Sequence, residues 1–132
     1  LIKKYNLEAI PMGYLVFNSE TAVASMGRAL PLPKNQPEVA VAYSLAAQYL
    51  GMRFIYLEAG SGASSPIPGE IIRAVASNVD IPVIVGGGIR TITHVDEVIK
   101  SGANVIVTGT LAEKNPDMLS KLIRHIREYK RT

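Results

Sequence analysis

Four short apolar segments recur along the chain, and turn residues bound each of them. They span residues 11–17, 53–58, 81–85 and 104–108, and each contains β-branched or aromatic side chains. Segments of this length and composition predict β-strands. The third runs directly into Gly86-Gly87-Gly88, and the fourth ends at Gly109-Thr110.

Helical patterns separate the predicted strands. Gln36-Pro37-Glu38 begins the first long helix, because proline at the first helical position gives up no hydrogen bond that the helix needs. Further helices are predicted over 70–77, after a capping Thr93 and from Asn115-Pro116 onward, with a short additional helix within 19–29. The apolar stripe expected to bury the first long helix consists of Val39, Tyr43, Ala46 and Leu50.

Strands and helices therefore alternate as βαβαβαβα, which predicts an α/β fold of parallel strands joined by right-handed crossovers. Two architectures share this order, a doubly wound sheet and a segment of a TIM (βα)8 barrel. A complete barrel typically takes ~250 residues, whereas this chain has 132. We expect a single domain over residues 1–132, with a number of units that fits half a barrel.

Composition narrows the class of protein. Hydrophobic residues make up 48% and charged residues 19%, which indicates a globular protein. The absence of Cys excludes a disulfide framework, a thiolate metal site and a cysteine nucleophile, and it is compatible with the cytoplasm, where we expect the protein. No apolar run reaches the ~18 residues of a membrane span. Basic residues concentrate in the last helix, but without the interleaved aromatics of a nucleic-acid surface, so we expect no nucleic-acid partner.

Two glycine-rich loops follow the third and fourth predicted strands. Glycine allows backbone N–H groups to approach an anion, and the N-terminus of a following helix adds a favourable dipole. In barrels the loops after strands seven and eight commonly form a phosphate site. The sequence therefore predicts a phosphate site between Gly87-Gly88 and Gly109-Thr110. The run Gly86-Gly87-Gly88 is not G-x-G-x-x-G and no suitably spaced acidic residue follows, which excludes a dinucleotide fingerprint.

The second predicted strand carries the candidate catalytic residues. Because side chains alternate along a strand, Tyr56 and Glu58 share one face, and Ile55 and Leu57 face the helices. A carboxylate at a barrel mouth accepts a hydrogen bond from a substrate hydroxyl or acts as its base. The alternative is a structural Glu58 paired with Arg90. Neither His94 nor His125 is expected to be catalytic, and their spacing is not that of metal ligands.

The motifs Y-L-E-A-G-S-G-A (56–63), V-G-G-G-I-R (85–90), T-G-T (108–110) and G-Y-L-V-F-N (13–18) resemble those of the geranylgeranylglyceryl phosphate synthase family, in the same order along the chain. The resemblance implies a modified (βα)8 barrel. It also implies a prenyltransferase of archaeal ether-lipid biosynthesis, which joins sn-glycerol 1-phosphate to geranylgeranyl diphosphate with the help of Mg2+. Glu58 and Tyr56 would be the catalytic residues, orienting the glycerol hydroxyls. The residues that would hold glycerol phosphate are Tyr56, Leu57, Glu58, Ala59, Gly60, Ser61, Gly62, Gly87, Gly88, Gly109 and Thr110.

By this resemblance the chain is the C-terminal half of the barrel. The Mg2+ ligands would lie in an N-terminal half, so the chain by itself is not expected to catalyse the reaction. A homo-oligomer is expected. Two other functions stay open: another phosphate-binding barrel, of the histidine- or tryptophan-biosynthesis type, and a half barrel that binds phosphate without catalysis.

Overall fold

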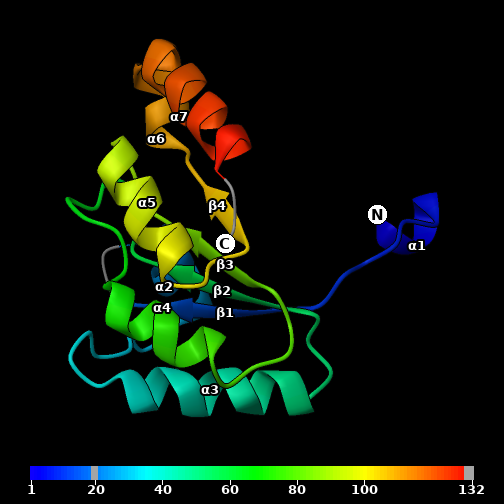
Figure 1. Ribbon diagram of the computed structural model, residues 1–132. Helices are drawn as coiled ribbons and strands as arrows, with labels where there is room; N and C mark the ends of the chain where they lie inside the picture. Colours follow the sequence, from blue (N-terminus) through cyan, green and yellow to red (C-terminus); the bar gives the residue numbers. More distant parts are fainter. Residues whose placement is uncertain (19–20, 130–132) are drawn as a thin grey trace.

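A computed structural model describes residues 1–18 and 21–129 of the chain (Figure 1). All four predicted strands are confirmed: β1 (Met12–Val16), β2 (Phe54–Glu58), β3 (Val83–Gly86) and β4 (Val105–Val107). They form one parallel sheet in which each strand pairs with the next in the order β1-β2-β3-β4. A doubly wound sheet reverses its strand order at a switch point. No reversal occurs among the four described strands, which favours a segment of a barrel.

Helices connect successive strands, as predicted. Two helices pack on the sheet, α3 (Pro37–Tyr49) and α4 (Gly69–Ala76). Next to α4 lies α5 (Ile92–Lys100), and α7 (Pro116–Glu128) lies beside α5 (Figure 1). Three shorter helices complete the described chain, α1 (Ile2–Tyr5), α2 (Ala22–Gly27) and α6 (Thr110–Lys114). No helix in the described ranges is long and apolar enough to cross a membrane.

The core lies between the sheet and its helices. Ile55, Leu57 and Val85 are fully buried on the helix-facing side of the strands. Burial of each such side chain contributes about 1.5–3 kcal/mol. Their partners in the core come mainly from α4 and α5, and include Ile71, Ile72, Val75, Val95 and Val98.

The apolar stripe predicted for α3 is wrong. Tyr43 and Leu50 are 56% and 79% exposed, whereas Ala40 and Ser44 are fully buried. The cause is a close approach of α3 to β1. A Cβ at Gly13 would lie 2.8 Å from the Cβ of Ala47, so only small side chains fit along this contact. The helix is apolar on several sides, and size rather than hydrophobicity decides which side faces the sheet.

Two helix boundaries also differ from the prediction. The N-cap of α5 is Thr91, not Thr93, since the Thr91 hydroxyl accepts a hydrogen bond from the backbone N–H of His94 at 3.2 Å. The short additional helix is α2, which occupies only the middle of the predicted range. Its cap is Thr21, which accepts from the Ala24 N–H at 3.0 Å. Residues 19–20, at the start of that predicted range, lie outside the described residues.

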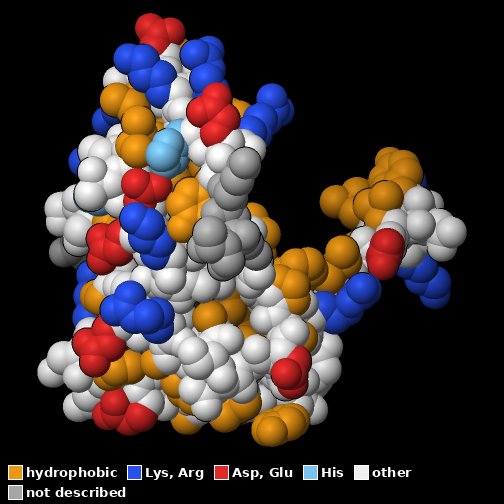
Figure 2. Space-filling model, viewed as in Figure 1, with side chains coloured by type: hydrophobic (Ala, Val, Ile, Leu, Met, Phe, Trp, Pro, Cys, Tyr) orange, Lys and Arg blue, Asp and Glu red, His pale blue; other side chains and the backbone are white. Residues whose placement is uncertain are grey.

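Surface chemistry differs between the two ends of the chain. Hydrophobic side chains gather along the segment that leads from α1 to β1 (Figure 2), where Leu7, Ile10 and Met12 are exposed. Over α6 and α7, on the face shown in Figure 2, side chains of both charges are interspersed. The last described helix therefore presents mixed charge on this face.

Candidate functional site

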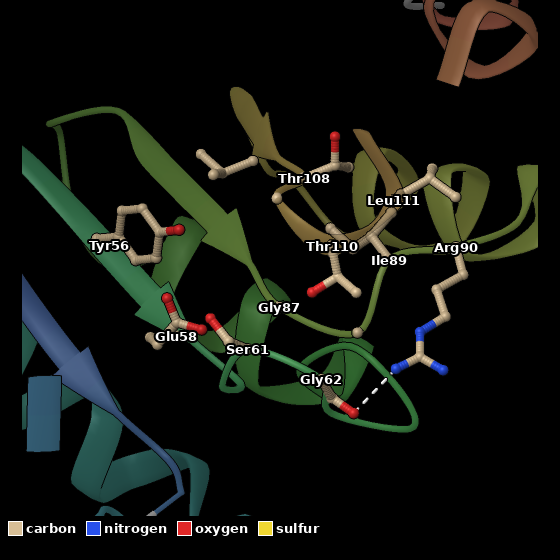
Figure 3. Close-up of a pocket in the computed structure, with 13 residues that line it drawn as sticks. Tyr56, Glu58, Ser61, Gly62, Gly87, Ile89, Arg90, Thr108, Thr110 and Leu111 are labelled. Atoms are coloured by element: carbon tan, nitrogen blue, oxygen red, sulfur yellow. Dashed lines mark hydrogen bonds between the residues drawn. The ribbon is translucent and has the colours of Figure 1, made fainter. Parts of the chain in front are cut away.

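A cleft of about 130 Å³ lies at the carboxyl ends of β2, β3 and β4 (Figure 3). Loops after parallel strands meet at this end of the sheet, which is why segments distant in sequence form one site. The predicted residues found in its lining are Tyr56, Glu58, Ser61, Gly62, Gly87, Gly88, Gly109 and Thr110. Ile89, Arg90, Val107, Thr108 and Leu111 complete it.

Three predicted binding residues do not line the cleft. The side chains of Leu57 and Ala59 are fully buried in the core, because alternation along the strand turns them toward the helices. Gly60 lies beneath Glu58 and donates its backbone N–H to the carboxylate. Along strand β2 and its end, the segment 56–63 therefore alternates between side chains that line the cleft and side chains that lie in the core.

Glu58 is held by two donors. Its Oε2 accepts a hydrogen bond from the Tyr14 hydroxyl at 2.7 Å, and its Oε1 accepts one from the Gly60 N–H at 2.6 Å. The residue is only 7% exposed. The suggested pairing of Glu58 with Arg90 is wrong, since the Arg90 guanidinium instead donates to the carbonyl oxygens of Gly62 and Ala63, both at 2.9 Å.

Two tyrosines flank this carboxylate. The rings of Tyr14 and Tyr56 stack with centroids 4.5 Å apart and planes 14° from parallel. Burial, reinforced by the charge of Glu58, raises the pKa of Tyr56 to about 12. Burial and the hydrogen bond to Glu58 raise the pKa of Tyr14 further. Both phenols therefore stay protonated well into the alkaline range, and the Tyr14 hydroxyl donates to Glu58, the carboxylate that lines the cleft.

The sequence analysis missed Tyr14. A signal existed, because Tyr14 is the residue of β1 that carries a polar group on the face shared with Tyr56. The parallel register pairs Tyr14 with Tyr56 and Val16 with Glu58. Strand alternation alone gives the face of a side chain but not its neighbour on the next strand. The register was therefore needed to recognise the contact.

Glycine has a different structural role in each of the two loops. Gly87 and Gly88 have φ of +83° and +71°, and a Cβ at Gly88 would lie 2.1 Å from the carbonyl oxygen of Ser65. This turn packs directly against the loop after β2, so glycine is required for packing there. At Gly109 an added Cβ would meet nothing within 4 Å. Glycine at 109 therefore leaves space open beside the cleft.

The described residues do not fit a magnesium site. No group of three or more His, Cys, Asp or Glu gathers anywhere in residues 1–18 and 21–129. Glu58 supplies the carboxylate of the cleft lining, and both of its oxygens already accept hydrogen bonds. Any metal dependence would need ligands beyond these residues.

Parallel strands in chain order, with a polar glycine-rich cleft at their carboxyl ends, define half of a (βα)8 barrel with a site suited to a small anionic ligand. A sequence profile of the PcrB family matches residues 1–129. The chain belongs to the PcrB family.

Similar proteins agree with this assignment. The geranylgeranylglyceryl phosphate synthase of Pyrococcus abyssi is 49% identical over 128 residues, which cover 96% of this chain and 51% of that protein. The enzyme of the same name from Staphylothermus marinus is 46% identical, over 97% of this chain and 52% of its own length. The (S)-3-O-geranylgeranylglyceryl phosphate synthase of Thermoplasma acidophilum, solved in complex with its substrate sn-glycerol-1-phosphate, superposes with a TM-score of 0.89 at 40% identity, covering 97% of this chain and 53% of that one. The chain thus spans about half the length of the relatives that it matches.

Proposed function

We propose that this chain is the glycerol-phosphate-binding half of a prenyltransferase that joins sn-glycerol 1-phosphate to geranylgeranyl diphosphate. The observation that carries the proposal is the cleft itself, where two glycine loops and the held carboxylate of Glu58 converge. The likeness to an enzyme solved with sn-glycerol-1-phosphate supports the same ligand.

The cleft divides into two parts that match the two ends of this ligand. The phosphate would lie against the backbone of Gly87-Gly88 and Gly109-Thr110, in the part of the cleft that also holds the Thr108 and Thr110 side chains. The glycerol part would then extend toward Glu58, Tyr56 and Ser61 (Figure 3). This arrangement would bring a glycerol hydroxyl to the proton acceptor of the site.

Ether formation needs that hydroxyl to attack C1 of the prenyl diphosphate. The bond from the hydroxyl oxygen to C1 forms while the bond from C1 to the diphosphate oxygen breaks, and the proton passes to Glu58. As diphosphate leaves, positive charge grows at C1 and the attacking hydroxyl becomes more acidic. A hydrogen bond to Glu58 is then stronger in the transition state than in the ground state, which is the kind of binding that accelerates a reaction.

Other parts of the proposal concern the whole protein. Geranylgeranyl diphosphate as the second substrate, Mg2+ as cofactor, a homo-oligomer and a cytoplasmic location all stay predictions. The Mg2+ ligands would have to come from beyond the described residues.

Titration of the 132-residue chain with sn-glycerol 1-phosphate, followed by calorimetry or by amide NMR shifts, tests the ligand. We expect binding that shifts the amides of 87–88 and 109–110, with much weaker binding of unphosphorylated glycerol. Equal binding of glycerol, or no binding of the phosphate ester by the chain, would contradict the proposal.

A further inference from the structure

We infer that Arg90 is a positioning residue, which fixes the loop after β2 so that the cleft distinguishes a glycerol phosphate from a bare phosphate. This inference rests on the proposed function and adds a role that neither the sequence motifs nor the shape of the cleft assigns. Arg90 lies at the end of the loop after β3, and its guanidinium reaches across to the neighbouring loop (Figure 3).

The loop after β2 requires interactions that hold its backbone in one conformation. Gly60 and Gly62 have φ of +108° and +81°, and glycine gives the backbone more freedom than any other residue. Ser61 and Gly62 are exposed, whereas Ala63 is partly buried against the core. Full burial resumes at Pro66 and Ile67. Hydrogen bonds therefore contribute much of what holds Ser61 and Gly62 in place.

The loop is anchored on both sides of Ser61. Before it, the Gly60 N–H donates to Glu58 Oε1 at 2.6 Å. After it, Arg90 Nη2 donates to the carbonyl oxygens of Gly62 and Ala63, each at 2.9 Å. Within the loop, the Ala63 N–H donates to the Gly60 carbonyl oxygen at 3.1 Å. The hydroxyl of Ser61 is thereby placed in the cleft beside Glu58 (Figure 3).

A guanidinium suits this task. Its terminal nitrogen carries two N–H groups in a rigid plane, one for each carbonyl oxygen, whereas an ammonium is a point charge on a flexible stem. Loss of the Arg90 hydrogen bonds would release the Ser61 side of the cleft and the donor beneath Glu58. Gly88 packs separately against the backbone of Ser65 and Pro66, at the buried end of the loop after β2, and Gly109-Thr110 belong to the loop after β4, so the phosphate end would stay in place. Arg90 should therefore affect the glycerol end of the site and not the phosphate end.

The experiment compares two ligands on one variant. We expect Arg90→Ala to weaken binding of sn-glycerol 1-phosphate roughly tenfold, the loss expected for one or two hydrogen bonds, while inorganic phosphate binds within about twofold of its original affinity. If both ligands weaken equally, Arg90 contacts the phosphate directly and the inference is wrong. It is also wrong if neither ligand weakens.

Two further variants make the result independent of folding. Arg73→Ala is the matched control, because Arg73 also donates to a side chain across elements, Ser101 at 3.1 Å, but far from the cleft. It should bind both ligands normally. Arg90→Lys should fall between the original chain and Arg90→Ala for glycerol phosphate, and added ethylguanidinium should restore part of the affinity of Arg90→Ala. A failure of the original chain to bind glycerol phosphate would instead defeat the proposed function.

Discussion

Glu58 is the residue on which the proposed chemistry depends, and its two oxygens have different partners. Gln at this position keeps the shape but cannot accept a proton. In the complete family barrel built with this half, we expect Glu58→Gln to lower turnover by roughly 10²–10⁴-fold, the usual value of general base catalysis. Stability should fall by only about 1 kcal/mol, because the Gln oxygen still accepts one hydrogen bond and Tyr14 can turn its hydroxyl to accept another. Turnover and thermal unfolding of one variant measure both quantities.

If the substitution lowers stability strongly and turnover only slightly, Glu58 has a structural role instead of a catalytic one. Turnover within tenfold of the original, together with a clearly lower melting temperature, would contradict the catalytic role. Tyr14→Phe is a useful companion, since it removes one donor to Glu58 and leaves the carboxylate and the stacked ring in place.

Tyr56 gives a pH test at the same scale. Its pKa is raised from 10.0 to about 12 in the folded chain. The unfolded chain therefore loses this proton first, so the contribution of Tyr56 to stability is complete below pH 10 and is lost as the pH rises from 10 toward 12. Absorbance at 295 nm should show that the phenol lost in Tyr56→Phe is one that titrates late. A loss of amplitude at the pH of an ordinary, exposed phenol would contradict a buried, neutral Tyr56.

At the residue scale, the sequence alone predicted which way the side chains of the second strand face. Alternation along the 53–58 segment placed Tyr56 and Glu58 in the cleft and Ile55 and Leu57 in the core, and the structure confirms both. The partner of Glu58 could not be predicted, because it depends on strand register. The second hydrogen bond to Glu58 comes from the Gly60 N–H. It requires a particular loop conformation, which the pattern of side chains does not predict.

The two glycine loops behave as separate elements, and a matched pair of variants distinguishes them. Gly109→Ala should fold normally, since an added methyl meets no atom within 4 Å, but it should weaken phosphate binding by filling space beside the ligand. Gly88→Ala should destabilise the chain strongly, since its methyl would overlap the Ser65 carbonyl and its φ is +71°. Denaturant unfolding and phosphate titration of both variants check this. Unchanged phosphate affinity in Gly109→Ala would contradict the predicted phosphate site.

Elements were predicted in type and order, but their faces and ends were not. The side of α3 that meets the sheet is set by how closely it approaches Gly13, a distance that no periodicity contains. The α5 cap was misplaced by two residues because Thr91 and Thr93 are both suitable caps, and the extended cap conformation, φ −132° and ψ 161°, falls at Thr91. Local chemistry predicts that a helix starts, whereas tertiary contacts fix where.

At the scale of the whole molecule, the open sheet limits activity. Within the described residues, β1 and β4 each pair on one side only, and Met12 and Val105 are exposed there. We expect the 132-residue chain alone to form no ether from the two substrates. Mixing it with the complementary half of a relative such as the Pyrococcus abyssi enzyme should close the barrel and restore Mg2+-dependent turnover. Radiolabelled prenyl transfer measures both samples.

The control for this experiment is the complementary half alone, which should also be inactive because it lacks the Glu58 cleft. Turnover by the 132-residue chain in the presence of Mg2+, without any partner, would show that the prediction is wrong. A mixture that associates but stays inactive would argue for the half barrel that binds phosphate without catalysis.

The pairing of strands in chain order also has a consequence for synthesis. Among the described strands, each new strand pairs with the strand made just before it, so these pairings join neighbouring parts of the sequence. Contacts between nearby parts of a sequence form quickly. On a ribosome, each βα unit could dock onto the preceding one as it emerges, and β1 would template β2 long before β4 exists. Besides the open edge of β1, the growing sheet would then expose one advancing edge, which the next residues to be translated cover.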